Sequence, residues 1–201
     1  MRHLFSILLL TFISFQLFAQ SPDSTTVTVH VIYGSKPLTK EEGKWFGGKL
    51  GGHIGLEVAP GKVLHFNPGG KFRVFGRKSE PGRYVISKVS DFYCTFGCDS
   101  IKKLAVRIPV SVAMQTRLDS LATLYCEHPP YPYAFFGMRC AAACYHLLSE
   151  ANVFPDYRKS KMIRKFFYPR RFRKRLLKRA VKNNWNIARK EGGSSRKWDH
   201  D

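Results

Sequence analysis

Apolar and polar residues follow a β-strand pattern along three stretches in the first half of the chain. Val27–Tyr33 alternates and is rich in β-branched residues, which predicts a strand. Ile54–Val58 and Lys62–Phe66 predict two more short strands, and Ala59-Pro60-Gly61 between them has the composition of a turn. The pattern therefore predicts a β-hairpin downstream of the first strand.

The remaining pattern predicts more strands and then helices. The further strand candidates are Lys71–Phe75, Tyr84–Val89 and Leu104–Val110. Ser111–Cys126 has helical spacing with Ser111 as a candidate N-cap, and Arg139–Ala151 has a continuous apolar helical face. We therefore expect an α+β fold in which an antiparallel sheet packs on the second of these helices.

The hairpin carries two histidines that the pairing register can bring together. If Val58 pairs with Lys62, this one pair fixes the partner of every other residue in the antiparallel hairpin. Side chains alternate with a period of two, so the residues on one face are then His53, Gly55, Glu57, His65 and Asn67. A shift of one residue would put the histidines on opposite faces. The alternative is two unrelated histidines at strand ends.

Cys140 lies where the second helix is expected to begin. The partial positive charge of a helix N-terminus and the neighbouring Arg139 predict a depressed thiol pKa. The Cys140 N–H is free of helix bonding there and could stabilise an oxyanion. A thiol, a base and an orienting group are what nucleophilic cysteine catalysis requires. Alternatively, Cys140 is a small apolar core residue, and Cys144, one turn further on, is better explained as a core or disulfide cysteine.

The N-terminus and the cysteines indicate export. Met1–Gln20 has a positive start and a short apolar run, as in a secretory signal peptide. We expect a periplasmic or secreted protein, in which disulfides can form. The odd count of five cysteines leaves at least one free thiol in a monomer. Cys94 and Cys98 could close a small loop, which leaves Cys126 and Cys144 as a second possible pair.

The positive charge is concentrated near the C-terminus. The formal net charge is +20, and Arg158–Lys190 holds fifteen Lys or Arg and no Asp or Glu. Pro169 is expected to start a helix here, with Phe172, Leu176, Leu177 and Ala180 as its apolar stripe. Such a segment suits an anionic envelope or membrane surface, and export makes nucleic acid an unlikely partner. The alternative is a solvated helix packed on the domain by its stripe.

The order and spacing of these motifs resemble a known superfamily over roughly Val27–Phe154. Gly-His-Ile-Gly-Leu-Glu-Val, Lys-Val-Leu-His-Phe and Arg-Cys-Ala-Ala-Ala-Cys-Tyr-His-Leu-Leu are similar to the two histidine strands and the cysteine helix of circularly permuted NlpC-type papain-like proteins. The lecithin:retinol acyltransferase-like proteins share this order. The resemblance implies Cys140 as nucleophile, His53 as general base and His65 as the residue that orients it, with Glu57 as an alternative third group.

One motif departs from the acyltransferase branch. That branch favours Asn-Cys-Glu-His at the helix start, where this chain has Arg139-Cys140-Ala141-Ala142. The departure favours hydrolysis of an amide bond, for instance in cell-wall peptide, over acyl transfer or lipid deacylation. A third hypothesis is a non-catalytic envelope-binding protein. We expect no cofactor and no metal, because His53 and Glu57 lack an obvious third ligand.

The expected organisation has four parts. Residues 1–20 form the signal peptide and residues 21–156 a papain-like cysteine hydrolase domain. Residues 157–191 form a basic helical extension, and residues 192–201, after a Gly-Gly-Ser-Ser run, form a disordered tail.

Overall fold

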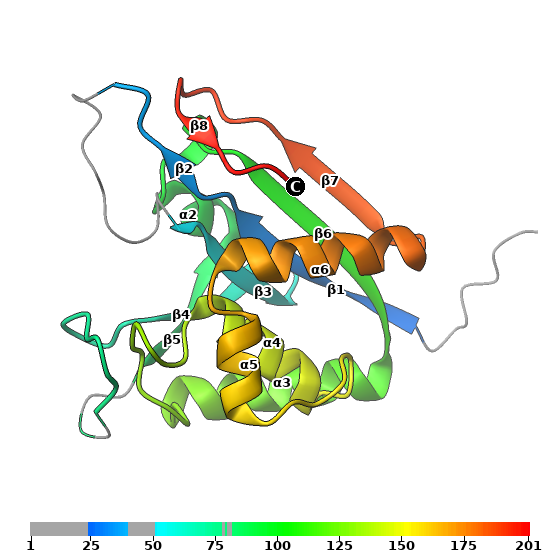
Figure 1. The fold of residues 1–201 in the computed structure, drawn as a ribbon. Coiled ribbons are helices and arrows are strands. Elements are labelled where there is room, and N and C mark those ends of the chain that lie inside the picture. Colours follow the sequence, from blue (N-terminus) through cyan, green and yellow to red (C-terminus); the bar gives the residue numbers. More distant parts are fainter. Residues whose placement is uncertain (1–23, 40–50, 78, 80–81) are drawn as a thin grey trace, which may run out of the picture.

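The computed structural model describes residues 24–39, 51–77, 79 and 82–201. The expected signal peptide lies outside these residues. Within the described part of the chain, no helix is both long and apolar enough to cross a bilayer. The fold is α+β, as the sequence predicts, with an antiparallel sheet and helices against both of its faces (Figure 1).

The main sheet has six strands in the order β5-β4-β3-β1-β6-β7, and all neighbouring strands are antiparallel. In chain order these strands are β1 (Ser24–Ile32), β3 (His53–Ala59), β4 (Lys62–Asn67), β5 (Arg83–Lys88), β6 (Lys103–Ser111) and β7 (Asn186–Lys190). A separate ribbon pairs β2 (Ser35–Lys36) with β8 (Lys197–Trp198). Strand β1 lies inside the sheet, between β3 and β6.

The helices are unequally divided between the two faces of the sheet. They are α2 (Val89–Cys94), α3 (Val112–Glu127), α4 (Cys140–Glu150), α5 (Lys159–Lys165) and α6 (Pro169–Lys182), with a 3-10 turn at Cys98–Ser100. Helices α3 to α6 pack into the larger hydrophobic core, whereas α2 contributes to a smaller cluster on the opposite face. The predicted α3 and α4 are confirmed, and Ser111 caps α3 by accepting from the Met114 N–H at 3.3 Å.

Strand β1 is buried on both faces, and its alternation divides the molecule. Val27, Val29 and Val31 belong to the large core beneath α3 and α4. Ile32 belongs to the smaller cluster, together with Phe92 of α2. His30 points to the same side as Ile32, since side chains alternate along a strand. The polar residues of the sheet are therefore collected on the α2 side.

One predicted strand is absent. Lys71–Phe75 has alternating polarity but forms a loop with no strand partner. Its backbone bonds instead to another loop, because the carbonyls of Arg73 and Val74 accept from the N–H groups of Phe135 and Phe136 at 2.8 and 2.9 Å. The alternation was a poor guide here because several of the apolar side chains stay exposed.

The C-terminal segment is part of the domain, which corrects two of the expected boundaries. Pro169 begins α6 as predicted, and the stripe Phe172, Leu176, Leu177 and Ala180 is buried in the main core. Strand β7 then joins the edge of the main sheet. The expected separate extension at 157–191 is therefore wrong, and so is the expected disorder at 192–201, because β8 pairs with β2 there.

A buried charge holds this segment in place. The Arg173 side chain, on α6, is 0% exposed and its Nε lies 3.1 Å from Oδ1 of Asp201. Its guanidinium lies 3.8 Å from the centre of the Tyr33 ring, and the Tyr33 hydroxyl donates to the same carboxylate oxygen at 2.7 Å. The contacts among Arg173, Tyr33 and Asp201 therefore connect α6, the residue that follows β1 and the C-terminal residues.

Asp201→Asn should lower the free energy of unfolding by about 1.5–3 kcal/mol, because it leaves the buried Arg173 guanidinium without its counter-charge, while solvent reaches the 38% exposed Asp201 side. The measurement is urea unfolding followed by circular dichroism. Arg189 is the matched control: its Nε lies 3.7 Å from the same carboxylate but its side chain is 46% exposed, so Arg189→Gln should cost about 1 kcal/mol or less. Equal effects of the two changes would contradict the assigned role of Arg173.

Candidate functional site

The two histidines of the hairpin lie on one face as predicted, although a bulge near the turn pairs Lys62 with Ala59 and not with Val58. Gly55 pairs with His65 and Glu57 with Val63, so His53 and His65 lie on one face of the sheet. Gly52 positions the start of β3: its φ is +74°, and a Cβ there would lie 2.3 Å from the Ile32 carbonyl oxygen. Nε2 of His53 lies 3.1 Å from Nδ1 of His65.

A chain of hydrogen bonds assigns the protons of these two rings. The Asn67 amide nitrogen lies 3.0 Å from Nδ1 of His65 and can only donate, so this Nδ1 is unprotonated. His65 therefore carries its proton on Nε2 and donates to the Ser87 hydroxyl at 3.1 Å. Because Nδ1 of His65 only accepts, His53 must donate to it from Nε2. The lone pair of His53 is then on Nδ1, which makes no hydrogen bond to any described residue.

The histidine pair is enclosed by aromatic rings from the α2 side. The His53 ring stacks on Phe96 with 4.9 Å between ring centres, and both imidazoles contact Phe92. Gly55 allows this contact, because a Cβ there would come within 2.9 Å of the Phe92 ring. The predicted Cys94–Cys98 disulfide is present and closes the turn that carries Phe96.

Burial keeps both imidazoles neutral. It lowers the pKa of His53 to about 3, with a further lowering by the neighbouring His65. Burial likewise lowers the pKa of His65 to about 4. A neutral imidazole is the form that can accept a proton, but a pKa this far below neutral pH makes His53 a weak base in its buried position.

A second polar cluster on the same face involves a residue that the sequence analysis missed. Nε2–H of His30 donates to the Glu57 carboxylate at 2.9 Å, and Nδ1 of His30 lies 2.8 Å from the Tyr93 hydroxyl. Glu57 also accepts from the Gly61 N–H at 2.8 Å. Both oxygens of its carboxylate therefore bond to groups other than His53. The signal for His30 was present, because it alternates with the buried valines of β1 and so faces the hairpin histidines.

Cys140 is the first residue of α4, as predicted, and its sulfur lies against backbone donors. The N–H groups of Ile54, Ala141 and Cys140 itself are directed at the thiol and favour its ionised form. Arg139 favours that form too, although its guanidinium bonds to the Phe167 carbonyl and lies 3.9 Å from the Phe167 ring centre. This is the donor arrangement expected where a helix N-terminus meets a strand.

The expected depression of the thiol pKa is wrong. Burial raises the pKa of Cys140 to about 11, and the backbone donors and Arg139 only partly oppose it. The side chain is 4% exposed, so the loss of hydration exceeds the effect of the helix terminus. Cys126 and Cys144 are also free thiols, so the second possible disulfide is not formed.

Cys140 and His53 approach the same peptide group from different sides. The N–H directed at the thiol belongs to Ile54, the residue that directly follows His53 in β3. Ile54 packs in the large core with α4, whereas the His53 ring packs with Phe92 and Phe96. Among the described residues no hydrogen bond joins the thiol to an imidazole. The structure thus brings His53 and His65 into contact and places the Cys140 thiol beside the His53 backbone.

The described residues contain no group of three or more His, Cys, Asp or Glu side chains arranged to hold a metal ion. His146 is partly buried in stacking contact with Tyr125, and its Nε2 lies 3.8 Å from the Glu150 carboxylate.

Comparisons with known proteins identify a fold-level neighbour only. The sequence matches no protein-family model and no curated protein. Among solved structures, the type VI secretion system effector TseH aligns with a TM-score of 0.41 at 13% identity. The alignment covers 73% of this chain and 89% of TseH. A likeness at this level carries no inference about activity.

The histidine pair should make the protein less stable in mild acid. The unfolded histidines bind protons below about pH 6.5, whereas the folded ones stay neutral until about pH 4 and 3. Their contribution is therefore complete above pH 6.5 and is lost as the pH falls towards 4, by roughly 1 kcal/mol per histidine per pH unit.

Urea unfolding at pH 7.5 and 5.5 measures this loss. The variant His53→Asn with His65→Gln should lose less stability between the two pH values than the parent, whatever its stability at pH 7.5. His128→Gln, at an exposed histidine, is the control substitution. A double variant with the same pH dependence as the parent would show that the pair is not held neutral.

Proposed function

We propose that the protein is an exported thiol hydrolase that cleaves amide bonds, with cell-wall peptide as the substrate class. Cys140 is the nucleophile, His53 the general base and His65 the residue that orients it. The observation that carries the proposal is the position of Ile54: its N–H points at the Cys140 thiol, and its peptide group begins at His53. The hydrogen-bond chain from Asn67 supports it, because that chain leaves the His53 lone pair on Nδ1.

The first half of the reaction forms a thioester. The Cys140 sulfur attacks the carbonyl carbon while its proton passes to Nδ1 of His53 through a water that enters with the substrate, because the thiol and the imidazole are not hydrogen-bonded to each other, and the carbonyl oxygen becomes an oxyanion. The Cys140 N–H, which has no helix partner, donates to that oxyanion. Nδ1 then returns the proton to the leaving amine as the C–N bond breaks.

The second half releases the acid. His53 takes a proton from water as the water oxygen attacks the thioester carbon. The C–S bond breaks, the proton returns to sulfur, and a carboxylic acid leaves. His65 accepts from Nε2 of His53 throughout and so holds the base in one tautomer.

The pKa values define how the proton must move. With the thiol pKa at about 11 and the His53 pKa at about 3, the resting pair is a neutral thiol and a neutral imidazole. A preformed thiolate–imidazolium pair is therefore disfavoured, and proton transfer accompanies formation of the C–S bond. Specific substrate binding, rather than intrinsic thiol reactivity, then governs the rate.

Muropeptide turnover tests the proposed activity. The parent protein should cleave amide bonds in a muropeptide mixture, detected by mass spectrometry as addition of water, and Cys140→Ala should abolish this. Cys144→Ala is the matched control, because Cys144 is a buried thiol one turn further along α4. Phosphatidylglycerol vesicles form the second substrate arm. Turnover of lipid alone would favour lipid deacylation, and loss of neither activity in Cys140→Ala would contradict a thiol mechanism.

Asn67→Asp tests the tautomer chain. A carboxylate at this position would accept from Nδ1–H of His65, and that proton would force His53 to accept at Nε2 and to protonate Nδ1. Acylation of Cys140 by p-nitrophenyl acetate, followed by intact-protein mass spectrometry, should slow by roughly a hundredfold, the scale of a lost general base.

The control for this variant is Asn67→Ser, which lacks a carboxylate and should slow acylation much less. The pH profile separates positioning from structure: the Asp variant should regain rate as the carboxylate is protonated, and a merely misfolded variant should not. Equal rates in the Asp variant and the parent would show that Asn67 does not set the tautomer.

A further inference from the structure

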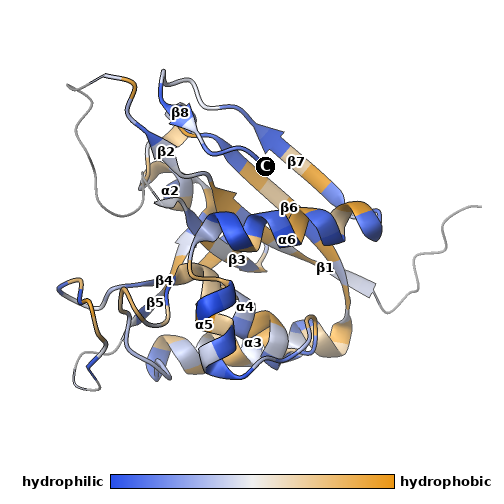
Figure 2. Cartoon of the chain, in the orientation of Figure 1, coloured by the Kyte–Doolittle hydropathy of each residue, from blue (hydrophilic) through white to orange (hydrophobic). Residues whose placement is uncertain are grey.

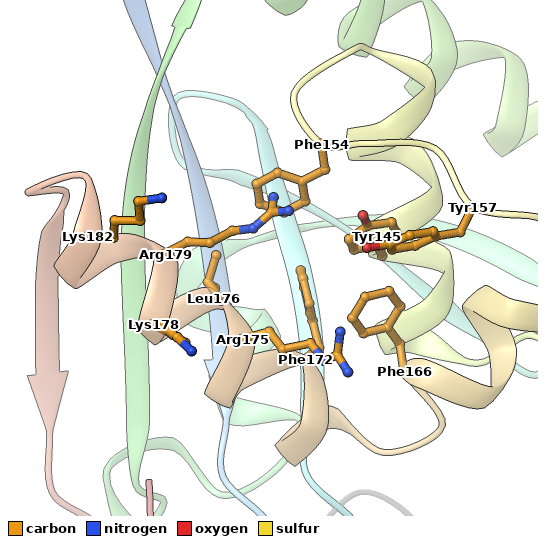
Figure 3. A pocket seen from close by; sticks show the side chains of 10 residues that line it. All are labelled: Tyr145, Phe154, Tyr157, Phe166, Phe172, Arg175, Leu176, Lys178, Arg179 and Lys182. Atoms are coloured by element: carbon orange, nitrogen blue, oxygen red, sulfur yellow. The ribbon is translucent and has the colours of Figure 1, made fainter.

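A pocket with an aromatic wall lies between α6 and the segment that follows α4. It has a volume of about 200 Å³ (Figure 3). Tyr145, Phe154, Phe166 and Phe172 form its wall and are themselves buried. Tyr145 stacks on Phe166 with 4.1 Å between ring centres, which makes the wall continuous. This pocket is distinct from the Cys140 site.

The opposite side of the pocket is cationic. Arg175, Lys178, Arg179 and Lys182 line it from α6. Two guanidinium groups point towards the aromatic wall in Figure 3: that of Arg179 lies 4.4 Å from the Phe154 ring centre and that of Arg175 lies 5.6 Å from the Phe166 ring centre. Within the described residues, none of the four cations has an ion-pair partner.

The chemistry of this pocket selects a small anion. Two guanidinium groups held over rings present planar donor forks, which match phosphate oxygens better than point charges do. On the same measure a single water molecule needs only about 10–15 Å³. The pocket therefore has room for a phosphate headgroup.

A neighbouring patch of exposed aromatic residues indicates where such a phosphate comes from. Phe72, Phe75 and Phe136 are 57%, 70% and 58% exposed, and the rings of Phe75 and Phe136 are 5.6 Å apart. The patch reaches Phe167, whose ring lies 6.2 Å from that of Phe136. Phe166, the preceding residue, lines the pocket, so the chain passes directly from the pocket to a residue that contacts the patch.

The surface around these features has the composition of a membrane-binding face. Figure 2 shows hydrophobic stretches in the loop between β4 and β5 and a mainly hydrophilic outer side of α5 and α6. Exposed aromatic rings beside a Lys- and Arg-rich helix are typical of proteins that lie on an anionic bilayer. A soluble phosphate ligand would leave the exposed rings without a role.

We propose that this pocket binds the phosphate group of an anionic phospholipid while the Phe72–Phe75–Phe136 patch enters the bilayer interface. Arg175 and Arg179 hold the phosphate, and Lys178 and Lys182 add attraction at the rim. The proposal extends the expected adhesion of the Arg158–Lys190 segment to a defined site. It does not rest on catalysis by Cys140, and Cys140→Ala should bind vesicles as the parent does.

Charge-preserving substitutions provide the test. Arg175→Lys with Arg179→Lys keeps every positive charge but removes both planar forks. Binding to vesicles of phosphatidylglycerol and phosphatidylcholine, measured by co-sedimentation, should weaken roughly tenfold. The matched control is Arg170→Lys with Arg171→Lys, two exposed residues of α6 outside the pocket, which should stay within about twofold of the parent. Thermal unfolding verifies that each variant is folded.

Three outcomes would overturn parts of the proposal. Equal binding by the two double variants would mean that general charge attraction, and not the pocket, holds the protein on the vesicles. Equal binding to pure phosphatidylcholine would exclude recognition of an anion. The third arm uses Phe75→Ser with Phe136→Ser, which should weaken vesicle binding but leave competition by soluble glycerol phosphate unchanged; unaltered vesicle binding would show that the patch does not enter the bilayer interface.

Discussion

The exclusion of water from both faces of β1 is the constraint on which the rest of the structure depends. One face presents Val27, Val29 and Val31 to a core that α3, α4 and α6 complete. The other face presents His30 and Ile32 to α2 and its aromatic residues. Because β1 also pairs on both edges, it fixes the position of β3, and α4 packs on β3 and its hairpin partner β4.

This burial acts in opposite directions on the two chemical groups of the candidate site. Loss of water favours the neutral form of any ionisable group. It therefore keeps the hairpin imidazoles deprotonated and the Cys140 thiol protonated. The two effects leave a site without charge at rest. Polar hydrogen bonds, rather than ion pairs, then determine its geometry, and they run from Asn67 through His65 to His53.

Local patterns in the sequence predicted the parts of the structure that local rules govern. The turn at Ala59-Pro60-Gly61 and the alternation around it were enough to bring His53 and His65 together, and the spacing of Cys94 and Cys98 was enough for their disulfide. The start of α4 at Cys140 followed from its apolar face. The triad itself remains a prediction.

The failures concern properties that distant residues decide. The thiol pKa of Cys140 depends on its burial against the sheet. The position of Cys140 at a helix N-terminus says nothing about that burial. The order of the last residues depends on the contact between Asp201 and Arg173, which lie far apart in the sequence. His30 was overlooked although its alternation with the valines of β1 places it on the face of the hairpin histidines, because its partners Glu57 and Tyr93 lie far from it in the sequence.

The disulfide between Cys94 and Cys98 links the state of the histidine pair to the compartment in which the chain resides. The bond closes the turn that presses Phe96 flat on His53. While the two thiols are reduced, only non-covalent contacts hold that ring in place, and each opening lets water reach the imidazole and moves its pKa back towards the ordinary value of 6.5. The buried, neutral state of the His53 imidazole thus depends on oxidation of Cys94 and Cys98 to the disulfide. In an oxidising environment the disulfide completes the turn over His53, and in a reducing one the same residues lack that covalent closure.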